Sequence, residues 1–116
     1  MSSNVIFFGW DRPVVGREQA AGELFQEFMQ YLAGLQQQGA IASFEAVFLT
    51  PHGGDLNGFF LLSGENSKLD ELAASEKWMS YLTRSGHYLE GAGAVRGATG
   101  DLVMEWMKLW AETLSA

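Results

Sequence analysis

The sequence contains no cysteine among its 116 residues. Disulfide frameworks, thiolate zinc sites and cysteine nucleophiles are therefore excluded. Basic residues are also scarce, since seven Lys and Arg stand against 14 Asp and Glu, for a formal net charge of −7. Because nucleic acids and anionic membranes bind basic surfaces, we expect neither as a partner.

Long apolar runs are missing as well. No segment approaches the ~18 consecutive apolar residues of a membrane-spanning helix. The chain begins with MSSNVIFFGW, and no basic residue precedes its apolar run, so the start is not typical of a secretory signal. We therefore expect a soluble, cytoplasmic protein with a single domain over residues 1–116.

Aromatic residues, by contrast, are plentiful. The chain has eight Phe, four Trp and three Tyr, and 47% of its residues are hydrophobic. This is a large apolar load for a short chain, and it indicates that part of the apolar surface is buried between subunits.

Four segments have the pattern of strands. Residues 4–10 (NVIFFGW) and 58–63 (GFFLLS) are continuously apolar, which is typical of strands covered on both faces. Residues 43–50 and 94–99 contain Glu45 and Arg96, which favour edge positions, and we expect Arg96 to point towards solvent.

Three segments have the pattern of helices. Residues 17–38 carry an apolar stripe at three- and four-residue steps, and Gly39 is a suitable stop. The next helical region begins near Ser67-x-x-Asp70, which resembles a capping box, and ends near Gly86. Ser75 has the features of a second cap, so this region is either one helix with a break or two helices.

The last helix, residues 102–114, is apolar over more than half of its circumference. An exposed helix of this kind needs a second surface to cover it.

The resulting order, β-α-β-β-α-β-α, begins with the split βαβ pattern of the ferredoxin-like α+β fold. Right-handed crossovers give an antiparallel sheet with the strand order 4-1-3-2. This order places the two continuously apolar strands in the centre. Because helices cover only one face of such a sheet, the apolar second face predicts a partner subunit.

The element order, together with SEKWMSYL at residues 75–82 and AVRG at residues 94–97, resembles the dimeric α/β-barrel superfamily. Its members include YCII-like proteins and cofactor-free antibiotic-biosynthesis monooxygenases. The resemblance implies a homodimer with its sheets face to face, and a pocket between each sheet and its helices. Some of these monooxygenases position an aromatic substrate with an Asn, a Trp and a Tyr. Trp78 and Tyr81 lie where such aromatics would point into a pocket, but no Asn can be matched, and a YCII-like histidine–aspartate pair is not recognisable at matching positions.

Residues 50–58 (TPHGGDLNG) combine a histidine with three glycines and an acid. One interpretation is a hairpin connection, because glycines allow positive φ and Asn-Gly favours turns. The other is a loop that brings His52 to a pocket mouth as a general acid or base, a role also open to His87. An esterase oxyanion hole is excluded because the chain has no G-x-S-x-G.

Neither histidine predicts a metal site. His52 with Asp55, and His87 with Glu90, would each supply two ligands, whereas a metal site usually needs three or four. We expect no metal and no cofactor.

An aromatic pocket is the main candidate binding site, with ordinary core packing as the alternative. Arg84, with Arg12, would anchor an anionic group there, unless both arginines are simply solvated. The ligand-binding candidates are Trp10, Phe60, Trp78, Tyr81 and Arg84.

Three functions remain open from the sequence. The first is the binding of a small apolar or aromatic molecule between sheet and helices. The second is a cofactor-independent monooxygenase- or isomerase-like enzyme that uses His52 or His87. The third is a structural or interaction dimer without catalysis. A pocket with a histidine favours the enzyme, and a pocket without one favours the binding protein.

Overall fold

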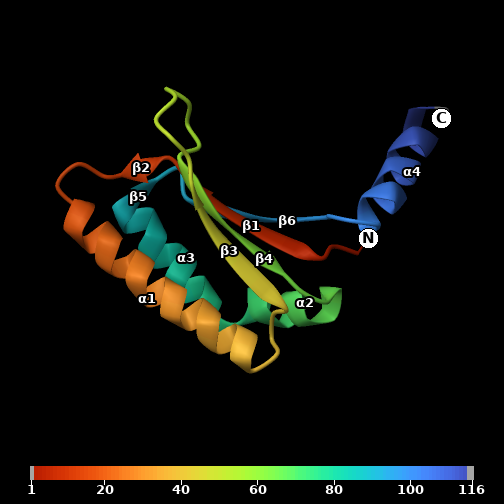
Figure 1. Ribbon diagram of the computed structural model, residues 1–116, viewed down its shortest axis with the longest axis horizontal. Coiled ribbons are helices and arrows are strands. Elements are labelled where there is room, and N and C mark those ends of the chain that lie inside the picture. Colours follow the sequence, from red (N-terminus) through yellow and green to blue (C-terminus); the bar gives the residue numbers. More distant parts are fainter. Residues whose placement is uncertain (1, 115–116) are drawn as a thin grey trace.

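The computed structural model of the chain describes residues 2–114. Figure 1 shows a sheet with helices packed on one side and a C-terminal helix that stands apart. The elements are β1 (Val5–Trp10), β2 (Arg12–Pro13), α1 (Glu18–Gln37), β3 (Ser43–Phe48), β4 (Gly58–Ser63), α2 (Asn66–Ala74), α3 (Glu76–Tyr88), β5 (Leu89–Glu90), β6 (Gly93–Gly97) and α4 (Leu102–Leu114).

The main sheet has the strand order β3-β4-β1-β6. Numbered among themselves and read from β6, these four strands lie in the order 4-1-3-2. All neighbours are antiparallel, and Phe8 in the middle of β1 lies opposite Phe60 on one side and Ala94 on the other. The two continuously apolar segments are therefore the two central strands.

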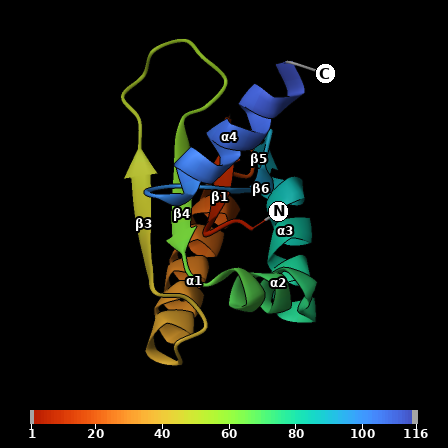
Figure 2. The same cartoon turned by 90° about the vertical axis from the view of Figure 1, so that its right-hand side faces the viewer.

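The helices α1, α2 and α3 lie on the same face of the sheet, as Figures 1 and 2 show from two directions. The side chains between these layers form one buried cluster, because alternate strand residues point towards the helices. Its members include Ile6, Phe8, Trp10, Leu24, Phe28, Leu32, Ile41, Phe60, Leu62, Leu69, Leu72, Trp78 and Tyr81.

The position of α1 follows from its apolar stripe. Ala21, Leu24, Phe28 and Leu32 are its buried residues, and their three- and four-residue spacing places them on one side of the helix. Beyond the end of α1, Gly39 has a φ of +78°, which a glycine adopts without steric cost. The predicted helix and its stop are confirmed.

The predicted break at Ser75 is also confirmed, and it separates two helices. Ser75 has extended backbone, and its Oγ accepts a hydrogen bond from the Trp78 N–H at 3.3 Å. Two details of this region were predicted wrongly. The cap residue of α2 is Glu65 rather than Ser67, and Gly86 lies inside α3, which continues to Tyr88.

The predicted orientation of Arg96 is wrong. Arg96 lies opposite Ile6, a buried core residue, and therefore points to the helix side of the sheet. There its guanidinium donates hydrogen bonds to the Asp70 carboxylate at 2.7 Å and to the Asn66 side-chain oxygen at 3.1 Å. Arg96 thus joins β6 to α2. Asp70, which was predicted as part of a capping box, instead accepts a hydrogen bond from Arg96.

A second, two-stranded sheet was not predicted. In it β2 pairs with β5, with Arg12 opposite Glu90 and Pro13 opposite Leu89. Each of these strands is only two residues long, so no alternation of apolar and polar residues is available to signal it.

The C-terminal helix α4 projects from the body of the molecule (Figure 1). None of its residues is buried, and even its large apolar side chains are open to solvent: Met104 is 67% exposed and Trp110 is 62% exposed. Its Trp106 indole N–H donates to the Ser2 carbonyl oxygen at 2.7 Å, which ties the start of the helix to the N-terminal segment. Within residues 2–114, no helix is both long enough and apolar enough to cross a membrane.

Candidate binding cavity

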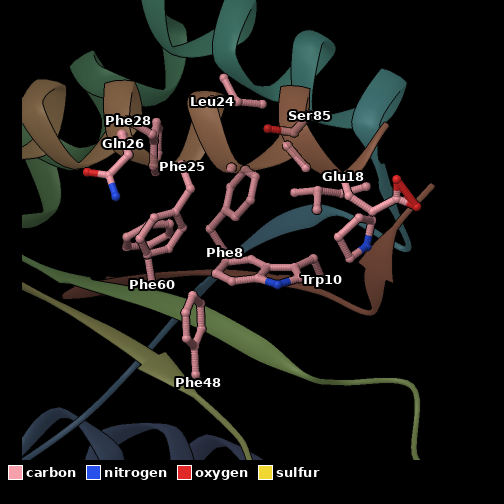
Figure 3. Close-up of a pocket in the computed structure, with 14 residues that line it drawn as sticks. Phe8, Trp10, Glu18, Leu24, Phe25, Gln26, Phe28, Phe48, Phe60 and Ser85 are labelled. Atoms are coloured by element: carbon pink, nitrogen blue, oxygen red, sulfur yellow. The ribbon is translucent and has the colours of Figure 1, made fainter. Parts of the chain in front are cut away.

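A cavity of about 350 Å³ lies between the sheet and the N-terminal half of α1. This volume is near the lower end of the ~300–1,000 Å³ typical of small-molecule sites. Figure 3 shows the side chains around it. They are Phe8, Trp10, Pro13, Glu18, Ala21, Gly22, Leu24, Phe25, Gln26, Phe28, Phe48, Phe60, Ser85 and Leu89.

One wall of the cavity is a cluster of aromatic rings. The ring centroids of Phe25 and Phe60 are 5.1 Å apart with an angle of 29° between the rings, and the Trp10 ring lies 5.5 Å from that of Phe60. Phe48 closes the cluster at the edge strand, 5.1 Å from Phe25, although its side chain is 69% exposed. This wall presents a broad apolar surface on which a flat molecule can stack.

The Trp10 indole keeps its place because its neighbour on β4 is a glycine. Gly58 lies directly opposite Trp10 in the antiparallel pair. A Cβ atom at residue 58 would lie 2.6 Å from the indole Cζ2, which is closer than real Cβ atoms approach. Gly58 is the first residue of β4, as the predicted strand 58–63 requires, and it makes room for the indole.

The opposite wall is made partly by small side chains. Ala21 and Gly22 come from α1, and Pro13 and Leu89 come from the two-stranded sheet. A Cβ atom at Gly22 would meet nothing within 4 Å. The cavity therefore exists in part because α1 carries almost no side chain at this turn.

The cavity has few polar groups. Glu18 and Gln26 are two turns apart on α1, and Figure 3 shows them at opposite ends of the site. Ser85 is buried, and its hydroxyl donates to the Tyr81 carbonyl oxygen at 2.7 Å. Ser85 is thus already satisfied within α3, which leaves the exposed Glu18 and Gln26 as the side chains open to a ligand.

The Glu18 carboxylate accepts hydrogen bonds from the Gly16 backbone N–H, at 2.9 Å and 3.1 Å to its two oxygens. These bonds stabilise the charged form and lower the pKa of Glu18 from its ordinary value of 4.5. Glu18 therefore carries a negative charge at neutral pH.

The structure brings only part of the predicted site together. Trp10 and Phe60 line the cavity, whereas Trp78 and Tyr81 do not. Trp78 is 2% exposed and packs on Phe28 with ring centroids 5.8 Å apart, so it is a core residue. The alternative interpretation, ordinary core packing, holds for Trp78 and Tyr81.

Arg84 also lies outside the cavity. Its guanidinium pairs with the Glu27 carboxylate and lies 5.6 Å from the centroid of the Tyr81 ring. The Arg84 pairing, together with a hydrogen bond from Tyr81, lowers the pKa of Glu27. Burial and the neighbouring Glu27 raise the pKa of the Tyr81 phenol, which therefore remains neutral. This cluster joins α1 to α3 on the outer surface of the helices.

Neither histidine reaches the cavity. His52 is exposed in the connection between β3 and β4, which projects beyond the sheet in Figure 1, and its Nδ1 lies 3.0 Å from the Thr50 carbonyl oxygen. His87 is exposed near the end of α3, with its ring beside Tyr88. The loop interpretation as a hairpin connection is confirmed, and His52 points outward. Among the described residues, no three histidine or acidic side chains converge on a shared point that would suit a metal ion.

Of the residues that line the cavity, only Trp10 and Phe60 were predicted, and Phe48, Glu18 and Gly22 show why the others were missed. Alternation places Phe48 on one face of its strand with Phe44 and Ala46, but its role as a wall depends on the packing of α1. In the sequence, Glu18 is recognisable only as an acidic residue in the first turn of a helix, which does not indicate a binding site. The sequence does not identify Gly22 as a cavity residue, because a single glycine in a helix reveals an empty space only when the packing around it is known.

No protein-family model matches the chain, and no curated protein matches it either. Several solved structures are similar, and two of them are described here. A dimeric protein of unknown function with a ferredoxin-like fold from Bacteroides fragilis has a TM-score of 0.57 and 13% identity, over 82% of this chain and 95% of that one. An uncharacterised NIPSNAP domain protein from Burkholderia xenovorans has a TM-score of 0.44 and 17% identity, over 84% and 95%.

The likeness to the Bacteroides fragilis protein bears on the fold alone, since the identity is low. The similarity to YCII-like proteins and antibiotic-biosynthesis monooxygenases stays a prediction. The sheet topology and the Bacteroides fragilis structure together show that this chain has a ferredoxin-like α+β fold.

Proposed function

We propose that this protein binds a small, largely apolar molecule in the cavity between the sheet and α1, without catalysing a reaction. One observation carries the proposal: six of the residues that line the cavity are aromatic, and no histidine, lysine or arginine of the described chain lines it. An aromatic wall suits the stacking of a flat ligand. The acid–base enzyme is not supported, because both histidines lie elsewhere.

We further propose that the protein acts as a homodimer. The sheet face opposite the helices carries Phe7 and Phe59, whose rings stack 4.9 Å apart, and Val95, which is 61% exposed. Together with the exposed apolar side of α4, this is more apolar surface than a monomer usually leaves in water. The dimeric state of the similar Bacteroides fragilis protein supports a second copy as the partner.

A cavity-filling substitution tests the binding proposal. Gly22→Leu places a side chain in open space at the cavity, and replacing a helical glycine removes a destabilising residue. The probe is 2-naphthylmethanol, a neutral bicyclic aromatic alcohol, and binding is followed by calorimetry. We expect saturable binding to the natural sequence and a loss of affinity of at least about tenfold in the variant.

Gly34→Leu is the matched control. Gly34 lies in the same helix, a Cβ atom there also meets nothing within 4 Å, and it is absent from the cavity lining. The two glycines are about 18 Å apart along α1, from the helical rise per residue. Equal affinities in all three proteins would contradict the proposal, and so would the absence of binding to the natural sequence.

A further inference from the structure

We propose that the ligand of this cavity carries an amine or another cationic group, and that the site discriminates against carboxylates. The inference rests on the proposed binding function and adds the charge of the ligand. It follows from the position of Glu18, from the absence of a basic side chain among the described residues at the cavity, and from the aromatic rings beside it.

Among the described residues, Glu18 is the only ionisable side chain that lines the cavity. Its carboxylate is held by the Gly16 N–H at one edge and remains exposed at the rim, where it has no cationic partner within residues 2–114. An ammonium group on an apolar ligand would meet this carboxylate as the ring system enters the cavity. A carboxylate on the same ring system would be repelled.

The arginines at this end of the molecule are occupied elsewhere. Arg12 pairs with Glu90 at 2.8 Å, Arg84 pairs with Glu27, and the Arg17 guanidinium lies 5.8 Å from the centroid of the Tyr88 ring. None of the three lines the cavity. Neither Arg12 nor Arg84 therefore places a positive charge at the cavity for an anionic group.

The aromatic wall reinforces this preference. Ring faces attract cations through their quadrupole, and Trp is the most effective ring for this interaction. Trp10, Phe25 and Phe60 form the wall that a ligand would contact. An aromatic or alicyclic amine would combine apolar stacking on these rings with the charge of Glu18.

Three probes that share one ring system test the inference. They are 2-naphthylmethylamine, a cation at neutral pH, the neutral 2-naphthylmethanol, and the anion 2-naphthoate. We expect the amine to bind about three- to tenfold more tightly than the alcohol, from one exposed ion pair and a cation–π contact, and the naphthoate to bind more weakly than either. The advantage of the amine should shrink in about 0.5 M salt.

Glu18→Gln removes the charge and keeps the size of the side chain. We expect this variant to lose most of the preference for the amine over the alcohol. Glu23→Gln is the control, because it changes the net charge equally, lies on the same helix, and does not line the cavity. The control should keep the preference.

The outcomes separate the two proposals. If no probe binds, the proposed binding function fails. If the alcohol binds but the amine and naphthoate bind equally well, or if both variants lose the preference alike, the binding function survives and the charge inference is overturned.

Discussion

The indole of Trp10 lies against Gly58, its cross-strand neighbour, so closely that no other residue fits at position 58 without displacing it. A Cβ atom there would be 2.6 Å from Cζ2 and 2.8 Å from Cε2 of the ring. Trp10 is also a wall of the cavity, 8% exposed and packed on Phe60. The shape of the proposed site therefore depends on a glycine that does not line it.

Gly58→Ala is expected to destabilise the protein and disturb the site together. Overpacking of this kind costs about 1–3 kcal/mol, and the indole must shift away from position 58. Chemical denaturation followed by circular dichroism would measure the loss. Gly93→Ala is the control, because Gly93 lies in β6 and a Cβ atom added there would meet nothing within 4 Å. Equal stabilities for the two variants would show that the Trp10 contact is not restrictive.

Ser75→Ala is expected to weaken the junction between α2 and α3. The Ser75 hydroxyl oxygen accepts from the Trp78 N–H, and its hydroxyl donates to the Leu72 carbonyl oxygen at 2.7 Å. Loss of a helix cap of this type costs about 1 kcal/mol. Ser80→Ala, at an exposed position inside α3, should cost nothing, because alanine favours a helix. Thermal melts of the two variants test this difference.

The homodimer predicts sensitivity to charge on α4. Met104→Glu combined with Trp110→Glu alters two exposed side chains, so the folded monomer should persist while the dimer dissociates. Gln36→Glu combined with Gln37→Glu on exposed positions of α1 adds the same charge elsewhere. Sedimentation velocity should find a dimer for the natural sequence and the control. A monomer for the natural sequence at micromolar concentration would contradict the proposal.

The preference for a cationic ligand should be lost only in acidic solution, where the Glu18 carboxylate becomes protonated. The Gly16 N–H lowers the pKa of Glu18 from its ordinary value of 4.5, so the carboxylate is charged near neutral pH. The ratio of affinities for 2-naphthylmethylamine and 2-naphthylmethanol should therefore hold from about pH 7 to 6 and fall only in more acidic solution, while the amine itself stays protonated. A ratio that falls between about pH 7 and 6, with the fold intact by circular dichroism, would assign the preference to another group.

Much of the fold could be predicted, because its signals are local. The apolar strands predicted at 58–63 and 4–10, the stripe along α1 and the cap at Ser75 each follow from residues close together in the chain. The face that a side chain occupies could not be predicted in every case. Arg96 faces the helices because it lies opposite Ile6, and that register is a property of two strands distant in sequence.

The site was harder to predict than the fold. Trp10 and Phe60 lie at the cavity because they belong to the helix-facing side of the central strands, whereas the rotation of α3 turns Trp78 and Tyr81 into the core. The gap beside Gly22 depends on the packing of α1 against the sheet, and no pattern in one sequence specifies it. His52 and His87 are candidates because histidine is a common acid–base residue, but the residue type alone does not indicate where a side chain points.

A crystal structure of the protein with saturating 2-naphthylmethanol is the sharpest test of the proposed site. We expect density for the naphthalene ring between the sheet and α1, in contact with Trp10 and next to Gly22. An empty cavity, or a probe bound only on the open face of the sheet beside Phe7 and Phe59, would contradict the proposed function.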